Sequence, residues 1–187
     1  NLKRRLAYST VSQLSYVIIA AALMSPISIM AATLHIAAHA FGNISLFSAA
    51  GSIYTAAHKT EISQLDGIGR KMPITMAAFT LGALSMIGLP PTAGFISKWV
   101  LVQAALERGQ WGLVFMIVGS SLLAIVYVWR FVEAAYFGTA PADVPPPARL
   151  RWQLVAPSAV LVAATVYFGI DTSFTLDAAT AAANQLL

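Results

Sequence analysis

Residues 87–100 read IGLPPTAGFISKWV and interrupt one of several long apolar runs in the chain. Two consecutive prolines, Pro90 and Pro91, stand inside this run, and Lys98 follows seven residues after the second. Proline removes a backbone donor and clashes with the preceding helical turn, so the pair predicts a break in a helix. The flanking Gly88 and Gly94 favour an unwound joint between two half-helices.

The composition places the chain in a membrane. Of its 187 residues, 58% are hydrophobic and 10% are charged. A soluble domain usually carries about 25% charged residues, so this chain has too little charge to cover a surface that faces water. Several apolar windows reach about 20 residues, the length of a helix that spans a bilayer. We therefore expect an all-α integral membrane protein embedded in the lipid bilayer, and its net charge of +4 does not indicate a nucleic-acid partner.

The apolar runs predict five transmembrane helices, over about residues 6–24, 27–57, 72–106, 112–137 and 152–168. The third run would reach roughly 50 Å at about 1.5 Å per residue, against a hydrocarbon core of about 30 Å, which also predicts a break at Pro90–Pro91. A proline-rich connector, residues 140–149, joins the last two spans. Residues 1–170 would form the helical bundle and residues 171–187 a C-terminal tail.

The charges between the spans predict the orientation. With the N-terminus inside, the outer segments hold only Arg108, and the inner segments hold Lys3, Arg4, Arg5, Lys59, Arg70, Lys71, Arg149 and Arg151. Basic residues concentrate on the cytoplasmic side of membrane proteins. We therefore expect the N-terminus inside and the C-terminus outside. The chain begins at Asn1 beside a basic cluster, so we also expect that the front of a larger protein is missing.

Lys98 is the charged residue that most needs an explanation. An unpaired lysine deep in a membrane costs roughly 2.5–3.5 kcal/mol on insertion scales. One interpretation is an amine that exchanges protons, and the other is a lysine that extends to the outer interface beside Trp99. The proline break favours the first interpretation, because broken helices often form ion sites in transporters.

Two histidines lie in the second run. His35 and His39 are four residues apart and share one helix face. Histidine titrates near neutral pH, so the pair fits a proton relay. Two other interpretations stay open: a metal site, for which no third ligand is evident, and histidines that only bond to neighbouring groups. We expect no metal and no cofactor.

The first span carries a dense stripe of hydroxyl and amide groups, which includes Ser9, Ser12 and Gln13. Such groups hold ordered water or bond helices to one another. Lys3, at the start of this span, is explained by charge at the inner interface unless other information assigns it a role.

Four stretches resemble a known family: LKRRLAYSTVSQLSY (2–16), HIAAHAFGNISLF (35–47), GIGRKMPITMAAF (67–79) and IGLPPTAGFISKW (87–99). They are similar to the second half of the antiporter-like proton-transporting membrane subunits, which respiratory complex I shares with the Mrp-type cation/proton antiporters. That family's fold has about fourteen helices in two inverted repeats, each with a broken helix. The resemblance implies that this chain is part of the second repeat.

The resemblance also implies roles for individual residues. Lys98 would be the key charged residue on the second broken helix, and Lys3, His35 and His39 would lie on the proton path that leads to it. Many relatives carry a lysine where this chain has Asn43. That difference removes a titratable group and leaves open a link through water held by Asn43 and nearby hydroxyls.

The resemblance implies proton translocation as one membrane subunit of a hetero-oligomeric assembly. Residues 59–73, KTEISQLDGIGRKMP, look closest to the D-type subunits of the Mrp branch, which predicts a monovalent cation/proton antiporter in a bacterial inner membrane. One alternative is a proton-pumping subunit of an NADH:quinone oxidoreductase or a related membrane hydrogenase. Another is a truncated scaffold without transport. The sequence leaves the exchanged cation open, Na⁺ included, and catalysis by this chain alone is not expected.

Overall fold

The computed structural model describes residues 1–139 and 152–186, and these form eight α-helices and one 3-10 helix. In chain order they are α1 (Leu2–Leu23), α2 (Pro26–Ala57), η1 (Ile62–Gln64), α3 (Ile68–Lys71), α4 (Pro73–Ile87), α5 (Ala93–Glu107), α6 (Trp111–Phe137), α7 (Trp152–Ile170) and α8 (Ser173–Leu186). The predicted connector 140–149 lies outside the described residues. The all-helical class expected from the composition is confirmed.

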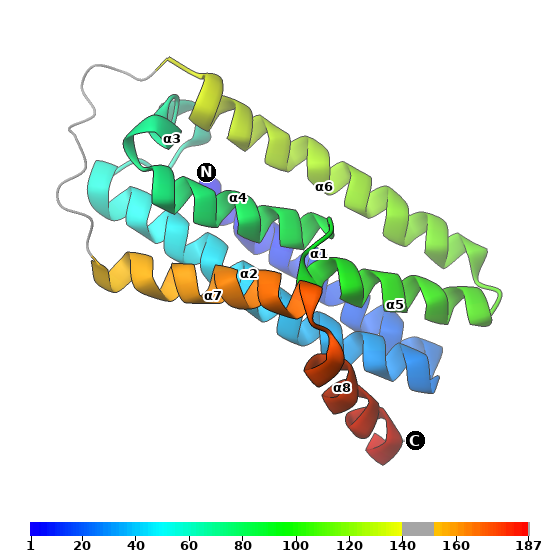
Figure 1. Ribbon diagram of the computed structural model, residues 1–187. Helices are drawn as coiled ribbons and strands as arrows, with labels where there is room; N and C mark the ends of the chain where they lie inside the picture. The colour runs from blue at the N-terminus through cyan, green and yellow to red at the C-terminus, as the bar shows by residue number, and fades with distance from the viewer. Residues whose placement is uncertain (140–151, 187) are drawn as a thin grey trace.

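Helix α2 is the centre of the bundle. It begins at a capping box in which the side chains of Ser25 and Ser28 bond each other's backbone N–H, with Pro26 as its first residue. Its 32 residues correspond to about 48 Å, so it runs the length of the molecule (Figure 1). Helices α1, α4, α5, α7 and α8 all pack against it.

The predicted helix break is confirmed. Helix α4 ends at Ile87 and α5 begins at Ala93, and the two half-helices meet near the middle of the bundle (Figure 1). Gly88 ends α4 with φ of 89°, a left-handed conformation that glycine adopts without strain. A Cβ on Gly94 would overlap the carbonyl oxygen of Ser85, so only glycine lets the start of α5 approach α4 this closely.

Three of the described helices, α1, α2 and α6, are each long and apolar enough to cross a membrane. Helices α7 and α8 meet this criterion only as a pair, bent by 79°. Helices α4 and α5 have 15 residues each, about 23 Å, so each is too short to cross a core of about 30 Å alone. The broken span is therefore built from these two half-helices.

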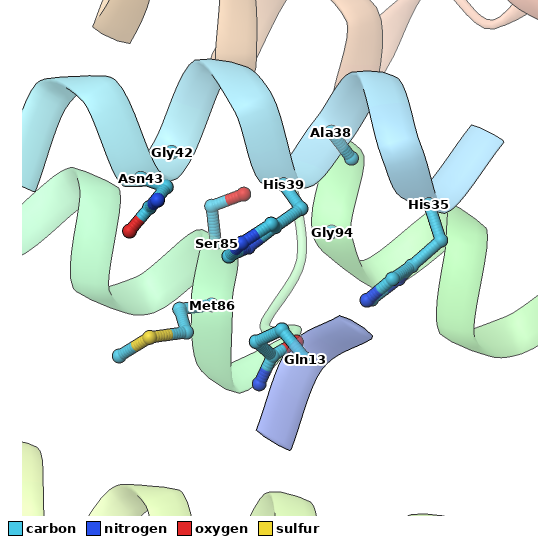
Figure 2. A pocket seen from close by; sticks show the side chains of 9 residues that line it. All are labelled: Gln13, His35, Ala38, His39, Gly42, Asn43, Ser85, Met86 and Gly94. Atoms are coloured by element: carbon cyan, nitrogen blue, oxygen red, sulfur yellow. The ribbon is translucent and has the colours of Figure 1, made fainter. Parts of the chain in front are cut away.

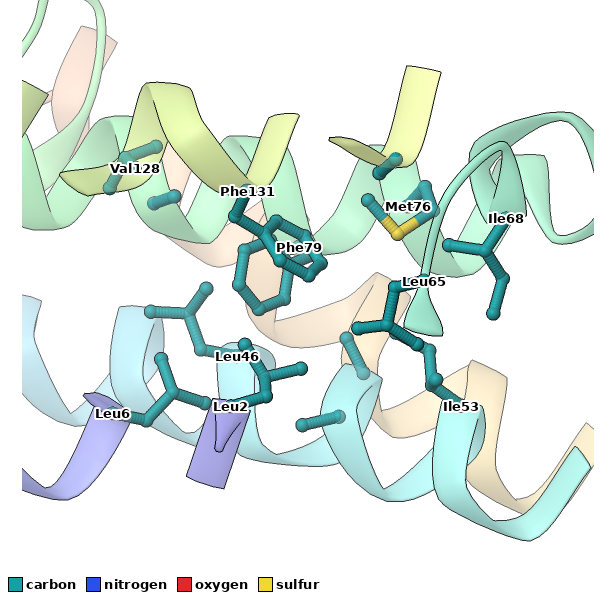
Figure 3. Close-up of a cluster of buried hydrophobic side chains, with 14 of the residues drawn as sticks. Leu2, Leu6, Leu46, Ile53, Leu65, Ile68, Met76, Phe79, Val128 and Phe131 are labelled. Carbon is teal, nitrogen blue, oxygen red and sulfur yellow. The ribbon is translucent and has the colours of Figure 1, made fainter. Parts of the chain in front are cut away.

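Two apolar clusters occupy opposite ends of the bundle. The first gathers side chains from α1 to α4 and α6, and Figure 3 shows its members, among them Leu6, Leu46 and the ring pair Phe79 and Phe131 with centroids 4.1 Å apart. The second includes residues of α1, α2, α5, α6 and α8: Tyr16, Ala20, Ala31, Ala32, Leu34, Val100, Leu101, Ile117 and Ala179. On α1, the buried polar residues Ser9 and Gln13 lie between the two clusters.

Basic residues gather at one end. Lys3, Arg4 and Arg5 begin α1, and Arg70 and Lys71 lie in α3, which is at the same end of the bundle as the N-terminus (Figure 1). Arg108, between α5 and α6, lies far from them along the bundle and donates from Nη2 to the carbonyl oxygen of Met24 at 2.7 Å. The folded chain thus keeps the charge asymmetry read from the sequence.

We expect that Gly94→Ala lowers the free energy of unfolding by about 1–3 kcal/mol, because the added Cβ forces the half-helices apart. The thermal midpoint of the purified protein in detergent measures this loss. Gly51→Ala is the matched control, since nothing lies within 4 Å of a Cβ at Gly51 in α2. An equal midpoint for the two variants would contradict the close approach at the break.

Candidate functional site: a buried lysine at a helix break

Lys98 lies on the second turn of α5 and is only 6% exposed. Its Nζ donates to the carbonyl oxygens of Met86 and Ile87, at 2.8 and 3.0 Å, and to Ser121 Oγ of α6, at 3.1 Å. Three protons on the ammonium thus have three acceptors. Among the described residues no carboxylate lies within ion-pair distance of it, so its charge is balanced by dipoles.

The prolines explain why those two carbonyls are available. In a continuous helix, the carbonyls of Met86 and Ile87 would accept from the N–H groups of residues 90 and 91. Those residues are Pro90 and Pro91, which have no N–H. The carbonyl end of a helix also carries partial negative charge. The break therefore leaves two unpaired carbonyl oxygens at the end of α4, a carbonyl cradle with partial negative charge, and Lys98 binds there.

His35 of α2 is bonded to a serine of α5. Its Nδ1 lies 2.9 Å from Ser97 Oγ, and Ser97 donates its single hydroxyl proton to the carbonyl oxygen of Gly94. The His35–Ser97 bond connects α2 to α5. Ser97 precedes Lys98 on α5, so this bond fixes His35 beside the lysine.

A small cavity joins the two histidines (Figure 2). His35 and His39 lie with their rings nearly parallel, 5° apart, and their centroids 6.3 Å apart. Neither Nε2 has a hydrogen-bond partner among the described residues, although both are buried. The cavity has a volume of about 10 Å³, which is room for about one water molecule. Its lining residues are Gln13, His35, Ala38, His39, Gly42, Asn43, Ser85, Met86 and Gly94.

The supporting polar residues expected from the sequence fall in three places. Asn43 lines the cavity and its Oδ1 accepts from Thr10 of α1 at 3.2 Å. Ser9 is buried and bonds Tyr127 of α6 at 3.0 Å and the sulfur of Met86. Ser12 is exposed and lines a surface hollow of about 480 Å³ between α1 and α6.

Gln13 lines both that hollow and the histidine cavity, so it separates the two. On the other side of the site, Lys98 and Ser121 line a second, mostly apolar hollow of about 260 Å³ between α5 and α6. The lysine and the histidines therefore lie between two hollows that open on the surface of the described chain.

Lys3 lies apart from this group. It is exposed in the first turn of α1, with Nζ 4.9 Å from the ring centroid of Tyr54. Gln13 is ten residues further along the same helix, about 15 Å. The described contacts do not connect Lys3 to the cavity.

Three contributors were not expected from the sequence: Tyr16, Ser97 and Ser121. Tyr16 of α1 is 5% exposed, and its ring centroid is 4.9 Å from Lys98 Nζ. Ser97 is the one serine of α5, and Ser121 follows Ser120 in the apolar helix α6, without a spacing that marks either as a site residue. The carbonyl cradle could have been predicted from the sequence. Pro90 and Pro91 lack N–H groups, so the carbonyls four residues earlier, those of Met86 and Ile87, lose their helical donors.

This fold and site define a helical membrane protein with a buried lysine at a broken helix. The chain belongs to the NADH:quinone oxidoreductase/Mrp antiporter transmembrane family, whose model matches residues 1–124. Family membership and the apolar helices together make it an integral membrane protein.

Curated relatives come from both branches of this family. The chain is 43% identical over 169 residues to NADH-quinone oxidoreductase subunit N of Desulforudis audaxviator, covering 87% of this chain and 34% of that protein. It is 34% identical over 183 residues to a component of a probable K⁺/H⁺ antiporter of Rhizobium meliloti, covering 94% of this chain and 18% of that protein. The chain thus spans about a third or less of these relatives.

Solved structures show the same fold. A chain of the Mrp complex from a Dietzia species superposes with a TM-score of 0.89 at 26% identity, over 97% of this chain and 42% of that one. A chain of respiratory complex I from Thermus thermophilus superposes with a TM-score of 0.80 over 97% of this chain and 39% of that one. At 22% identity, the second match concerns the fold alone. The expected antiporter-like fold is confirmed.

We expect Lys98 to resist reductive methylation in the folded protein, because its ammonium is buried and fully bonded. Lys3 is the matched control, since it also lies over a tyrosine ring but is exposed. Mass spectrometry should find Lys3 methylated and Lys98 near background, and Lys98 should be methylated only after denaturation. Equal modification of the two lysines in the folded protein would contradict the burial of Lys98.

Proposed function

We propose that this chain carries protons across a membrane as part of an antiporter-like subunit in a hetero-oligomeric assembly. The observation that carries the proposal is the buried Lys98, which is bonded to uncharged acceptors and follows Ser97, the residue that bonds His35 at the histidine cavity. A carboxylate beside Lys98 would favour the charged form of the amine and make release of its proton harder. An ammonium held only by dipoles needs less change in its surroundings to release a proton.

The proposed path runs from the α1–α6 hollow to Lys98. Gln13 separates the hollow from the cavity, where one water molecule has room to connect Nε2 of His39 with Nε2 of His35. A proton on the histidine side then moves to the neutral amine of Lys98, which becomes the ammonium while the imidazole becomes neutral. Release toward the α5–α6 hollow, past Ser121, returns the lysine to its neutral form.

In this proposal, Lys98 exchanges the proton and His35 and His39 relay it, as predicted from the sequence. Asn43 and Ser9 hold α1 in place against α2, α4 and α6, and Ser12 adds a hydroxyl to the lining of the α1–α6 hollow. Lys3 enters the path only if groups outside the described chain connect it to the cavity. Otherwise its charge serves the inner interface, where it would set the orientation with the N-terminus inside and the C-terminus outside.

Two assemblies are candidates, both in a bacterial inner membrane. The 43% identity to an NADH-quinone oxidoreductase subunit N supports a proton-pumping subunit of an oxidoreductase. The TM-score of 0.89 against a chain of an Mrp complex, together with the Mrp-like run 59–73, supports a cation/proton antiporter of the Mrp type, with this chain in its D-type subunit. Purification of the tagged protein from its own membranes distinguishes them. Iron–sulfur partners would support the oxidoreductase, and Na⁺-dependent proton flux without such partners would support the antiporter.

We expect Lys98→Ala and Lys98→Arg both to abolish proton flux while the complex still assembles. Alanine removes the proton carrier, and arginine stays charged at every accessible pH, so it does not exchange. The measurement is quenching of a pH-sensitive dye in inverted membrane vesicles, with a native gel to check assembly.

Lys59→Arg is the matched control for this pair, since Lys59 lies in the loop after α2. Its flux should equal that of the unmodified protein. Full flux in Lys98→Arg would support a lysine that only supplies charge, as in a scaffold, and would refute the proton-exchange role.

We expect His39→Asn to slow proton flux roughly 100-fold, because proton transfer groups contribute about 10²–10⁴ and asparagine does not titrate. His58→Asn is the matched control, because His58 is exposed in the left-handed conformation that asparagine tolerates. It should leave the flux unchanged in the same vesicle assay. If both variants slowed flux equally, the histidine pair would not be a relay.

A further inference from the structure

Within the described chain, Tyr16 is the one aromatic residue with ring contacts to both Lys98 and His35. Its ring centroid is 4.9 Å from Lys98 Nζ and 5.3 Å from the ring centroid of His35, with the two rings at 68°. The side chain comes from α1, the lysine from α5 and the histidine from α2. Tyr16 therefore lies where three helices meet around the lysine.

The hydroxyl of Tyr16 is directed elsewhere. It lies 2.6 Å from Ser120 Oγ of α6. Ser120 directs its own proton to backbone carbonyls of α6, those of Met116 and Ile117 at 2.6 and 3.0 Å. The Tyr16–Ser120 bond must then be donated by Tyr16, so the phenol proton points to α6 and away from Lys98 and His35.

What faces the lysine is consequently the ring. The face of an aromatic ring is negative and attracts a cation, and the attraction is strongest where water is excluded. It acts on the ammonium and not on the neutral amine. It adds to the pull of the Met86 and Ile87 carbonyls in holding the protonated side chain in place. His35 is the titratable group of α2 in contact with the same ring, and its Nδ1 is bonded to Ser97.

We propose that Tyr16 is a positioning residue whose ring face holds the protonated Lys98 against the carbonyls of Met86 and Ile87 and lies beside both the ammonium and His35. The inference rests on the proposed proton transport. It assigns Tyr16 no proton of its own to move. The ring helps to keep the ammonium at the Met86 and Ile87 carbonyls. The position of the ammonium in turn affects the rate at which protons pass between the histidines and Lys98.

The first experiment compares Tyr16→Phe with Tyr16→Leu in the assembled complex, using dye-detected proton flux in inverted vesicles. Phenylalanine keeps the ring face and loses only the bond to Ser120, so its flux should stay within about twofold of the unmodified protein. Leucine removes the ring, and its flux should fall roughly tenfold. Tyr16→Met replaces Tyr16→Leu, with the same expectation, if the leucine variant does not assemble.

A second experiment separates the ring's charge distribution from its shape. Phenylalanine with one, two and three fluorine atoms is placed at position 16 by nonsense suppression. Fluorine withdraws electron density from the ring face while it changes the volume little, so cation binding weakens stepwise. Flux should fall in the same order across the series. A residue that only fills space would give the same flux throughout.

The controls keep this inference distinct from the proposed function. Tyr167→Leu removes an exposed tyrosine of α7, whose ring centroid lies 5.3 Å from that of Phe168, and should leave the flux unchanged. If Lys98→Ala abolishes flux but Tyr16→Leu and the fluorinated series match the unmodified protein, the role of Tyr16 is refuted while proton transport stands. If Lys98→Ala keeps full flux, the proposed function is refuted, and the role of Tyr16 is refuted with it.

Discussion

The bond of one ammonium to two unpaired carbonyls organises this structure. The double proline leaves the carbonyls of Met86 and Ile87 without their helical donors, and Lys98 supplies the replacement at 2.8 and 3.0 Å. Each half would be unfavourable alone, because buried carbonyls without donors and a buried charge without acceptors both cost free energy. Together they satisfy each other. The break in the helix and the lysine after it are therefore one feature.

The surroundings of this bond keep it at depth. The two apolar clusters close the bundle at either end, and the polar residues of α1 and α2 lie between them. The long central helix contributes His35 and His39, while α5 contributes Ser97 and the lysine. One serine hydroxyl bonds His35, and one tyrosine ring faces the ammonium. In the proposed function, small rearrangements among these few groups change which one holds a proton, because electrostatic interactions are strong between buried groups.

Part of this was readable in the sequence. Low charge and long apolar runs determined an all-helical membrane protein, because hydrocarbon accepts only backbone that is bonded within its own segment. Pro90 and Pro91 determined the break through their missing donors, and the spacing of His35 and His39 determined a shared face. The short stretches around these residues were also enough to indicate the family. Local covalent chemistry and helical periodicity carry all of these inferences, and neither requires knowledge of how the helices pack.

The tertiary structure alone decided what surrounds the lysine. Tyr16, Ser97 and Ser121 come from three different helices, and the packing angles that bring two of them to Lys98 have no signature along the chain. The same packing placed Gln13 between a surface hollow and the histidine cavity and left Lys3 at the end of the bundle. It also formed α8 from the polar tail and turned it by 79° from α7 to rest on α2. Contacts between helices depend on residues far apart in sequence, so their geometry exists only once the bundle has formed.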